Sequence, residues 1–170
     1  MEYIPEPTIE KEIGRIIQSL EWGHLDPNRI HVVSSRGSKS RRILARCHTL
    51  PKALQAGLAI PAHYVIELVS ENYDRLPEIE KTKTLIHELM HIPVTFGGGF
   101  RNHDYVRAHR VNKFYARYIE TRSAAFECSN DFKMPAPSDR IGEVGPAEPA
   151  GSGDSIREGR GMRPGALLSD

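Results

Sequence analysis

Two histidines four positions apart, His87 and His91, constrain this chain more than any other feature of its sequence. They frame a His-Glu-x-x-His pattern that lies between Pro77 and Pro93. Proline is tolerated in the first turn of a helix, and the residue before a proline leaves the helical region, so one helix is predicted over residues 77–92. Side chains four apart on a helix lie one above the other, and both imidazoles can therefore reach one metal ion.

The glutamate inside the pattern, Glu88, is suited to proton transfer. A zinc ion lowers the pKa of a bound water toward about 7, and a neighbouring carboxylate can take its proton and later deliver it to a leaving amine. Glu88 is too close in sequence to His87 to serve readily as a third ligand. It lies beside the face of the helix that carries the two imidazoles. The pattern therefore predicts a zinc hydrolase that cleaves a peptide or protein substrate, with Zn²⁺ as cofactor and Glu88 as general base.

A catalytic zinc ion has three protein ligands and one open position, so a third donor must come from elsewhere in the chain. His103 is the leading candidate, because it follows His91 across a loop with three glycines and is expected to open a further helix over residues 103–122. The metzincin spacing is excluded, since Val94 and Gly97 stand where it requires glycine and histidine. Less favoured third ligands remain open, and these are Asp104, His109 and Glu120.

The periodicity of the remaining chain predicts an α+β fold. Apolar residues recur at three- and four-residue steps over residues 8–20, which predicts an amphipathic helix. Strands are predicted at 29–35, 42–48 and 62–69, and a short helix at 51–57. We therefore expect a small twisted sheet of about three strands that packs on the His-Glu-x-x-His helix and on further helices.

Composition predicts one soluble domain followed by a tail. The chain has 170 residues with a net charge of +1, no apolar run long enough to cross a bilayer, and an acidic N-terminus unlike a secretory signal. We expect a cytoplasmic protein with no membrane partner. Residues 134–170 are rich in glycine and proline and poor in large apolar side chains, which predicts a disordered tail after a metallopeptidase domain over residues 1–133. The two cysteines, Cys47 and Cys128, fit no Cys-x-x-Cys clip and are interpreted as reduced bystanders.

The residues around the pattern also carry a family resemblance. Residues 64–69, 78–93 and 95–104 together resemble the family described as putative metallopeptidases of archaea and phages, and more distantly the SprT-like minimal gluzincins. The resemblance covers about residues 5–130. It implies a zincin-like domain with peptidase activity. In the SprT-like proteins a third histidine follows the His-Glu-x-x-His helix at a somewhat longer interval and stands at the start of a helix. That histidine is usually followed by glycine in the SprT-like proteins, whereas His103 is followed by aspartate here.

Two further features predict binding surfaces. In zincins generally, the strand at the edge of the cleft pairs with an extended substrate, so the main chain of residues 65–69 is a candidate for binding a peptide, with plain sheet surface as the alternative. A basic cluster could instead contact nucleic acid, and its members are Arg36, Lys39, Arg41, Arg42 and Arg46. The alternative function is thus a nucleic-acid-associated protein whose zinc ion only tethers two helices. Candidates for stabilising an oxyanion are Arg101, Tyr105 and His109.

Overall fold

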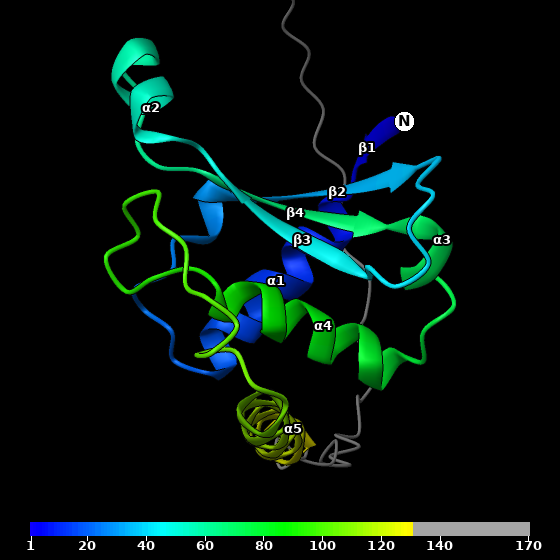
Figure 1. Ribbon diagram of the computed structural model, residues 1–170. Helices are drawn as coiled ribbons and strands as arrows, with labels where there is room; N and C mark the ends of the chain where they lie inside the picture. The colour runs from blue at the N-terminus through cyan, green and yellow to red at the C-terminus, as the bar shows by residue number, and fades with distance from the viewer. Residues whose placement is uncertain (131–170) are drawn as a thin grey trace, which may run out of the picture. The chain divides into compact units, whose positions relative to one another are not determined.

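The computed structural model describes residues 1–130, with side chains up to residue 124, and the predicted tail at 134–170 lies outside this part. Four strands form one sheet in the order β1-β2-β4-β3 (Figure 1). Their bounds are Glu2–Pro5 (β1), Ile30–Arg36 (β2), Ala45–Thr49 (β3) and Tyr64–Val69 (β4). β2 and β4 are parallel, whereas β1 joins β2 and β3 joins β4 in antiparallel pairs.

The expectation of about three strands missed β1. Its four residues, Glu-Tyr-Ile-Pro, are too few to show an alternating pattern, and the proline in them argues against a strand. The strand nevertheless forms at the edge of the sheet, where Glu2–Pro5 pairs with residues 33–36 of β2. Proline is tolerated there because one side of an edge strand makes no ladder hydrogen bonds.

Five α-helices accompany the sheet within the described residues, and α1 and α4 lie against the same face of it (Figure 1). Their bounds are Pro7–Ser19 (α1), Lys52–Leu58 (α2), Ser70–Tyr73 (α3), Glu78–Met90 (α4) and Ala108–Asn130 (α5). A 3₁₀ turn at Pro27–Arg29 precedes β2. The fold is therefore of the mixed α+β class, as predicted.

The last helix begins later than its sequence suggests. We expected it to open at His103, but α5 starts at Ala108. The backbone N–H of Arg101 donates to the carbonyl of His91, and that of Tyr105 donates to the carbonyl of Asn102. These bonds fold the segment into turns against the end of α4, so His103 lies in a loop.

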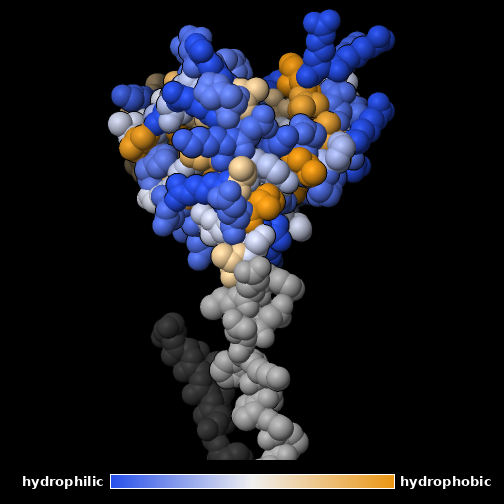
Figure 2. All heavy atoms as spheres, turned by 90° about the horizontal axis from the view of Figure 1, so that it is seen from below, coloured by the Kyte–Doolittle hydropathy of each residue, from blue (hydrophilic) through white to orange (hydrophobic). Residues whose placement is uncertain are grey.

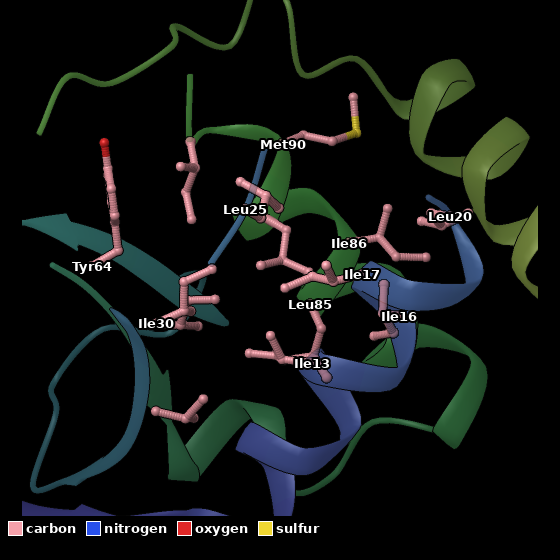
Figure 3. Close-up of a cluster of buried hydrophobic side chains, with 14 of the residues drawn as sticks. Ile13, Ile16, Ile17, Leu20, Leu25, Ile30, Tyr64, Leu85, Ile86 and Met90 are labelled. Carbon is pink, nitrogen blue, oxygen red and sulfur yellow. The ribbon is translucent and has the colours of Figure 1, made fainter. Parts of the chain in front are cut away.

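The core fills the space between the sheet and the two helices below it (Figure 3). Each of the three elements contributes side chains that are almost fully buried: Ile13 and Ile16 of α1, Leu85, Ile86 and Leu89 of α4, and Ile30, Tyr64 and Ile66 of the sheet. Burying one such side chain contributes about 1.5–3 kcal/mol relative to exposing it. α4 is therefore held firmly by its apolar side, which fixes where its polar side points.

The surface on the helix side is mostly polar. Seen from below, it is covered largely by hydrophilic residues, and the apolar patches on it are small and separate (Figure 2). Within residues 1–130, no helix combines the length and the apolar character that crossing a membrane requires.

β3 forms the free edge of the sheet beside α4, and this corrects one expectation. The predicted peptide-pairing segment, residues 65–69, belongs to β4, which is paired on both sides by β2 and β3. Its main-chain groups are therefore already paired, whereas β3 is an edge strand and has one unpaired side. The carbonyl of Leu44 accepts a hydrogen bond from Val69, and the N–H of Leu50 donates to His63, so both groups point toward β4. The direction of the peptide groups alternates along a strand. Those of Ala45, Cys47 and Thr49 therefore point to the free edge.

Candidate metal centre

Three histidine side chains converge at the end of α4. His87 and His91 come from successive turns, and His103 reaches them from the loop before α5. One ring nitrogen of each lies within 4.8 Å of the others, and the Nε2 atoms of His87 and His91 are 3.2 Å apart. Among residues whose side chains the structure describes, no other group of three metal-ligating side chains comes together in this way.

His91 is held from behind by the loop that follows α4. Its Nδ1 lies 2.6 Å from the carbonyl oxygen of Arg101, to which it donates in the tautomer that leaves Nε2 as the acceptor. The ring of Phe100 stacks on the imidazole at 4.5 Å with an angle of 9° between the planes. A hydrogen bond to the second nitrogen fixes the orientation and tautomer of metal-binding histidines in general, so His91 is arranged as a ligand would be.

The glycine loop that carries these contacts is anchored to the sheet by Tyr64. Its hydroxyl accepts a hydrogen bond from the N–H of Gly98 at 3.0 Å and donates to the carbonyl of Gly99 at 3.1 Å. Gly98 has a φ of +82°, and a Cβ there would lie 2.1 Å from Nε2 of Gln55 and 3.0 Å from the carbonyl oxygen of Leu50. Only glycine fits this position, which places the loop so that His103 follows at the metal centre.

Gly98→Ala is therefore expected to destabilise the protein by about 2 kcal/mol, since a left-handed conformation costs a residue with a Cβ roughly 1–2 kcal/mol before any clash. Urea unfolding measures the change. Gly97→Ala is the matched control, because its Cβ would meet no atom closer than 3.8 Å and its φ is not in the positive range. Equal midpoints for the two variants would contradict the role of Gly98.

Burial sets the protonation of the groups at this centre. It lowers the pKa of His87 to about 4, helped by the neighbouring His91 and His103. Burial also lowers the pKa of His91, although the bond to the Arg101 carbonyl acts in the opposite direction. Burial raises the pKa of Glu88 to about 7, while a hydrogen bond from the Cys47 backbone lowers it. At neutral pH the imidazoles of His87 and His91 are therefore uncharged, which is the state that binds a metal ion.

A cleft of about 720 Å³ opens between β3, α4 and the start of α5, and the three histidines and Glu88 lie in its wall. Cys47 of β3 lines it beside Glu88, and burial followed by the charge of Glu88 raises the pKa of this thiol to about 12. The cysteine that we interpreted as a bystander is thus part of the cleft wall, although its thiol stays protonated. The side chain of Cys128 lies outside the part of the chain for which side chains are described.

A family model described as "Putative phage metallopeptidase" matches residues 1–126, which include the cleft and all three histidines. The chain belongs to this family. The match agrees with the resemblance seen in the sequence, and membership in a metallopeptidase family implies a bound metal. Neither the curated proteins nor the solved structures include a match to the chain.

Some of the site residues predicted from the sequence of this family member lie together in the cleft, and others do not. His87, Glu88, His91 and His103 meet in the cleft. The less favoured third ligands Asp104, His109 and Glu120 do not join the histidine group. The proposed oxyanion donors do not line the cleft: the guanidinium of Arg101 stacks on the ring of Tyr105 at 4.3 Å, and His109 is exposed on α5.

Sequence reasoning missed the residues that hold His91 and the glycine loop in place. Tyr64, Phe100 and the Arg101 carbonyl act through contacts that no spacing pattern encodes. One signal was available, because three consecutive glycines between two candidate ligands indicate a close approach of the backbone to another element.

Proposed function

We propose that this chain is a zinc-dependent metallopeptidase with a zincin-like domain, in which His87, His91 and His103 hold the ion and Glu88 is the general base. The observation that carries the proposal is the convergence of three imidazole nitrogens within 4.8 Å in a cleft that also contains Glu88. Three protein ligands with space beside them are typical of a catalytic zinc site, whereas structural sites are closed by four.

The chemistry of the donors supports zinc. Two nitrogens bound at about 2.0–2.1 Å in a tetrahedral arrangement are separated by about 3.3 Å, and the Nε2 atoms of His87 and His91 lie 3.2 Å apart. Neutral imidazoles suit zinc well, while calcium and magnesium prefer oxygen ligands. When bound, such an ion supplies a Lewis acid that polarises the substrate carbonyl and acidifies water.

Glu88 is suited to move the proton. A carboxyl with a pKa near 7 is an effective acid and base at neutral pH, because it accepts and returns a proton with little loss of driving force. Cys47 of the edge strand lies beside this carboxylate in the cleft wall. In the proposed reaction Glu88 takes a proton from the attacking water and delivers it to the nitrogen of the leaving amine.

The free edge of β3 offers a binding site for the substrate backbone. The peptide groups of Ala45 and Thr49 point away from β4, so an extended peptide that adds to this edge would lie along the cleft wall. Main-chain bonds of this kind supply affinity without depending on side chains. They would hold a peptide bond beside Glu88, which lies with Cys47 in the cleft wall.

Removal of the metal is the first test. Treatment with a strong zinc chelator is expected to abolish cleavage of an unfolded protein such as casein, and one equivalent of Zn²⁺ is expected to restore it. Atomic absorption on the purified protein should find about one zinc per chain. Activity that survives complete metal removal would refute the proposal.

Nucleic-acid contact by the basic cluster stays a prediction. Arg36, Lys39, Arg41 and Arg42 are exposed at and after the end of β2, whereas Arg46 is engaged with the buried carboxylate of Glu67 at 2.9 Å. No observation of the described residues favours a nucleic acid over another anionic partner.

A further inference from the structure

We propose that Arg42 selects peptides with a carboxylate on the C-terminal side of the cleaved bond, either an acidic side chain or a nearby chain end. The inference rests on the proposed function, because it assigns the substrate preference of the same cleft. It follows from the charge of the cleft, the anchoring of the loop that carries Arg42, and the direction in which a peptide would lie along β3.

The first step is the charge balance of the cleft wall. Three cationic side chains line it, and two of them have carboxylate partners: Arg46 pairs with Glu67 at 2.9 Å and Lys83 with Glu80 at 3.0 Å. Arg42 forms no ion pair with any residue in the described part of the chain. Its exposed guanidinium is therefore the cation in this wall that remains available to a ligand.

The second step is the anchoring of the loop between β2 and β3, which lies beside α3 (Figure 1). The side-chain amide of Asn72 donates to the carbonyls of Ser40 and Ile43, at 2.8 Å in each case. The carboxylate of Glu71 accepts from the backbone N–H of Gly37 at 2.6 Å. Two neighbouring residues of α3 thus fix the backbone on both sides of Arg42, so its position at the cleft is set by tertiary contacts.

The third step is the direction of the substrate. Antiparallel pairing is somewhat more stable per residue than parallel pairing, so a peptide that adds to β3 is expected to run opposite to it. Its N-terminal part then lies near Thr49, and its C-terminal part lies near Ala45 and continues toward Arg42. Since Glu88 faces Cys47 between these ends, residues after the cleaved bond approach Arg42.

The chemistry of this end of the cleft completes the argument. Ile43, Leu44 and Ala45 form an apolar stretch directly after Arg42 in the cleft wall. A peptide with an apolar residue just after the cleaved bond and a carboxylate a few residues later would match both features. Arginine suits this task because its planar guanidinium binds a carboxylate through two parallel hydrogen bonds.

The test compares peptides that differ only in having Glu, Gln or Lys at one of the first four positions after the cleaved bond. At the best position the Glu peptide is expected to have a kcat/KM about three- to five-fold above the Lys peptide, as for an exposed ion pair, and the difference should shrink in high salt. Arg42→Glu is expected to reverse the order. Arg41→Glu is the matched control, because Arg41 is exposed in the same loop but does not line the cleft.

A binding measurement separates this inference from the proposed function. Fluorescence anisotropy with the same labelled peptides on the Glu88→Gln protein reports preference without cleavage. Binding that favours the Glu peptide, and that Arg42→Glu reverses, supports the role of Arg42 even if no peptide is cut.

Cleavage or binding without a charge preference overturns the inference and leaves the proposed peptidase function intact. If Arg41→Glu and Arg42→Glu change the preference for Glu peptides by the same amount, the inference is also overturned. The preference would then come from the overall positive charge of the loop, which is also the property that nucleic-acid binding would use. Absence of both binding and cleavage refutes both proposals.

Discussion

Glu88→Gln is expected to lower the rate of peptide cleavage by about 10²–10⁴-fold while the protein keeps its metal, because the amide cannot accept the proton that general base catalysis requires. Glutamine has nearly the same shape as glutamate, so the packing of this buried side chain is expected to stay unchanged. Steady-state kinetics with a fluorogenic peptide, alongside the metal content of the purified variant, measures both halves of this expectation.

Glu78→Gln is the matched control for this variant. Glu78 lies in the first turn of the same helix, and its side chain is 84% exposed and paired only with Lys81. Its substitution should change activity less than about two-fold, since exposed ion pairs contribute little. If Glu88→Gln retained wild-type activity, Glu88 would not be the base, whatever the metal content.

His103→Ala is expected to weaken zinc binding by about 100-fold. Zinc sites with four ligands bind with about 10–16 kcal/mol, so one ligand contributes roughly 3 kcal/mol, or two powers of ten in the dissociation constant. Competition with a chromogenic chelator gives the affinity. The loss should appear without a comparable change in the stability of the metal-free protein, because His103 is exposed and contributes nothing to the core.

His109→Ala provides the comparison for His103→Ala. Both histidines are exposed and six residues apart, but only His103 belongs to the convergent group. The affinity of His109→Ala should match that of the unmodified chain. A ranking in the opposite order would show that the third ligand had been assigned to the wrong histidine.

The elements with strong local signals were predictable from sequence. α1 and α4 follow from apolar periodicity and from proline at or before their first turn, and their observed bounds agree with the predicted ones within two residues or so. β1 and the start of α5 were not predictable in this way. β1 is too short to carry a pattern. The turns before Ala108 depend on a hydrogen bond from Arg101 to His91 at the end of α4 and on one from Tyr105 to Asn102, which helical periodicity does not encode.

The candidate site was also predictable only where local signals determine it. The pairing of His87 with His91 needs only one turn of helix, so the local pattern suffices. The choice of edge strand was wrong because strand order depends on pairing between segments far apart in the chain. β4 follows β3 in sequence and precedes α4, yet it lies inside the sheet. No periodicity distinguishes an edge strand from a central one when both are half-buried or better.

The sequence by itself therefore determined the α+β class, the helix with its two histidines and glutamate, and the nomination of His103. Tertiary structure decided that His103 faces the other two histidines, that β3 borders the cleft, and that Arg42 reaches its rim. The physical reason is the range of the interactions. Helical periodicity acts over a few residues, whereas the loop carrying His103 is fixed by Tyr64, 34 and 35 residues before Gly98 and Gly99, and Asn72 fixes the loop of Arg42 from 29 and 32 residues away.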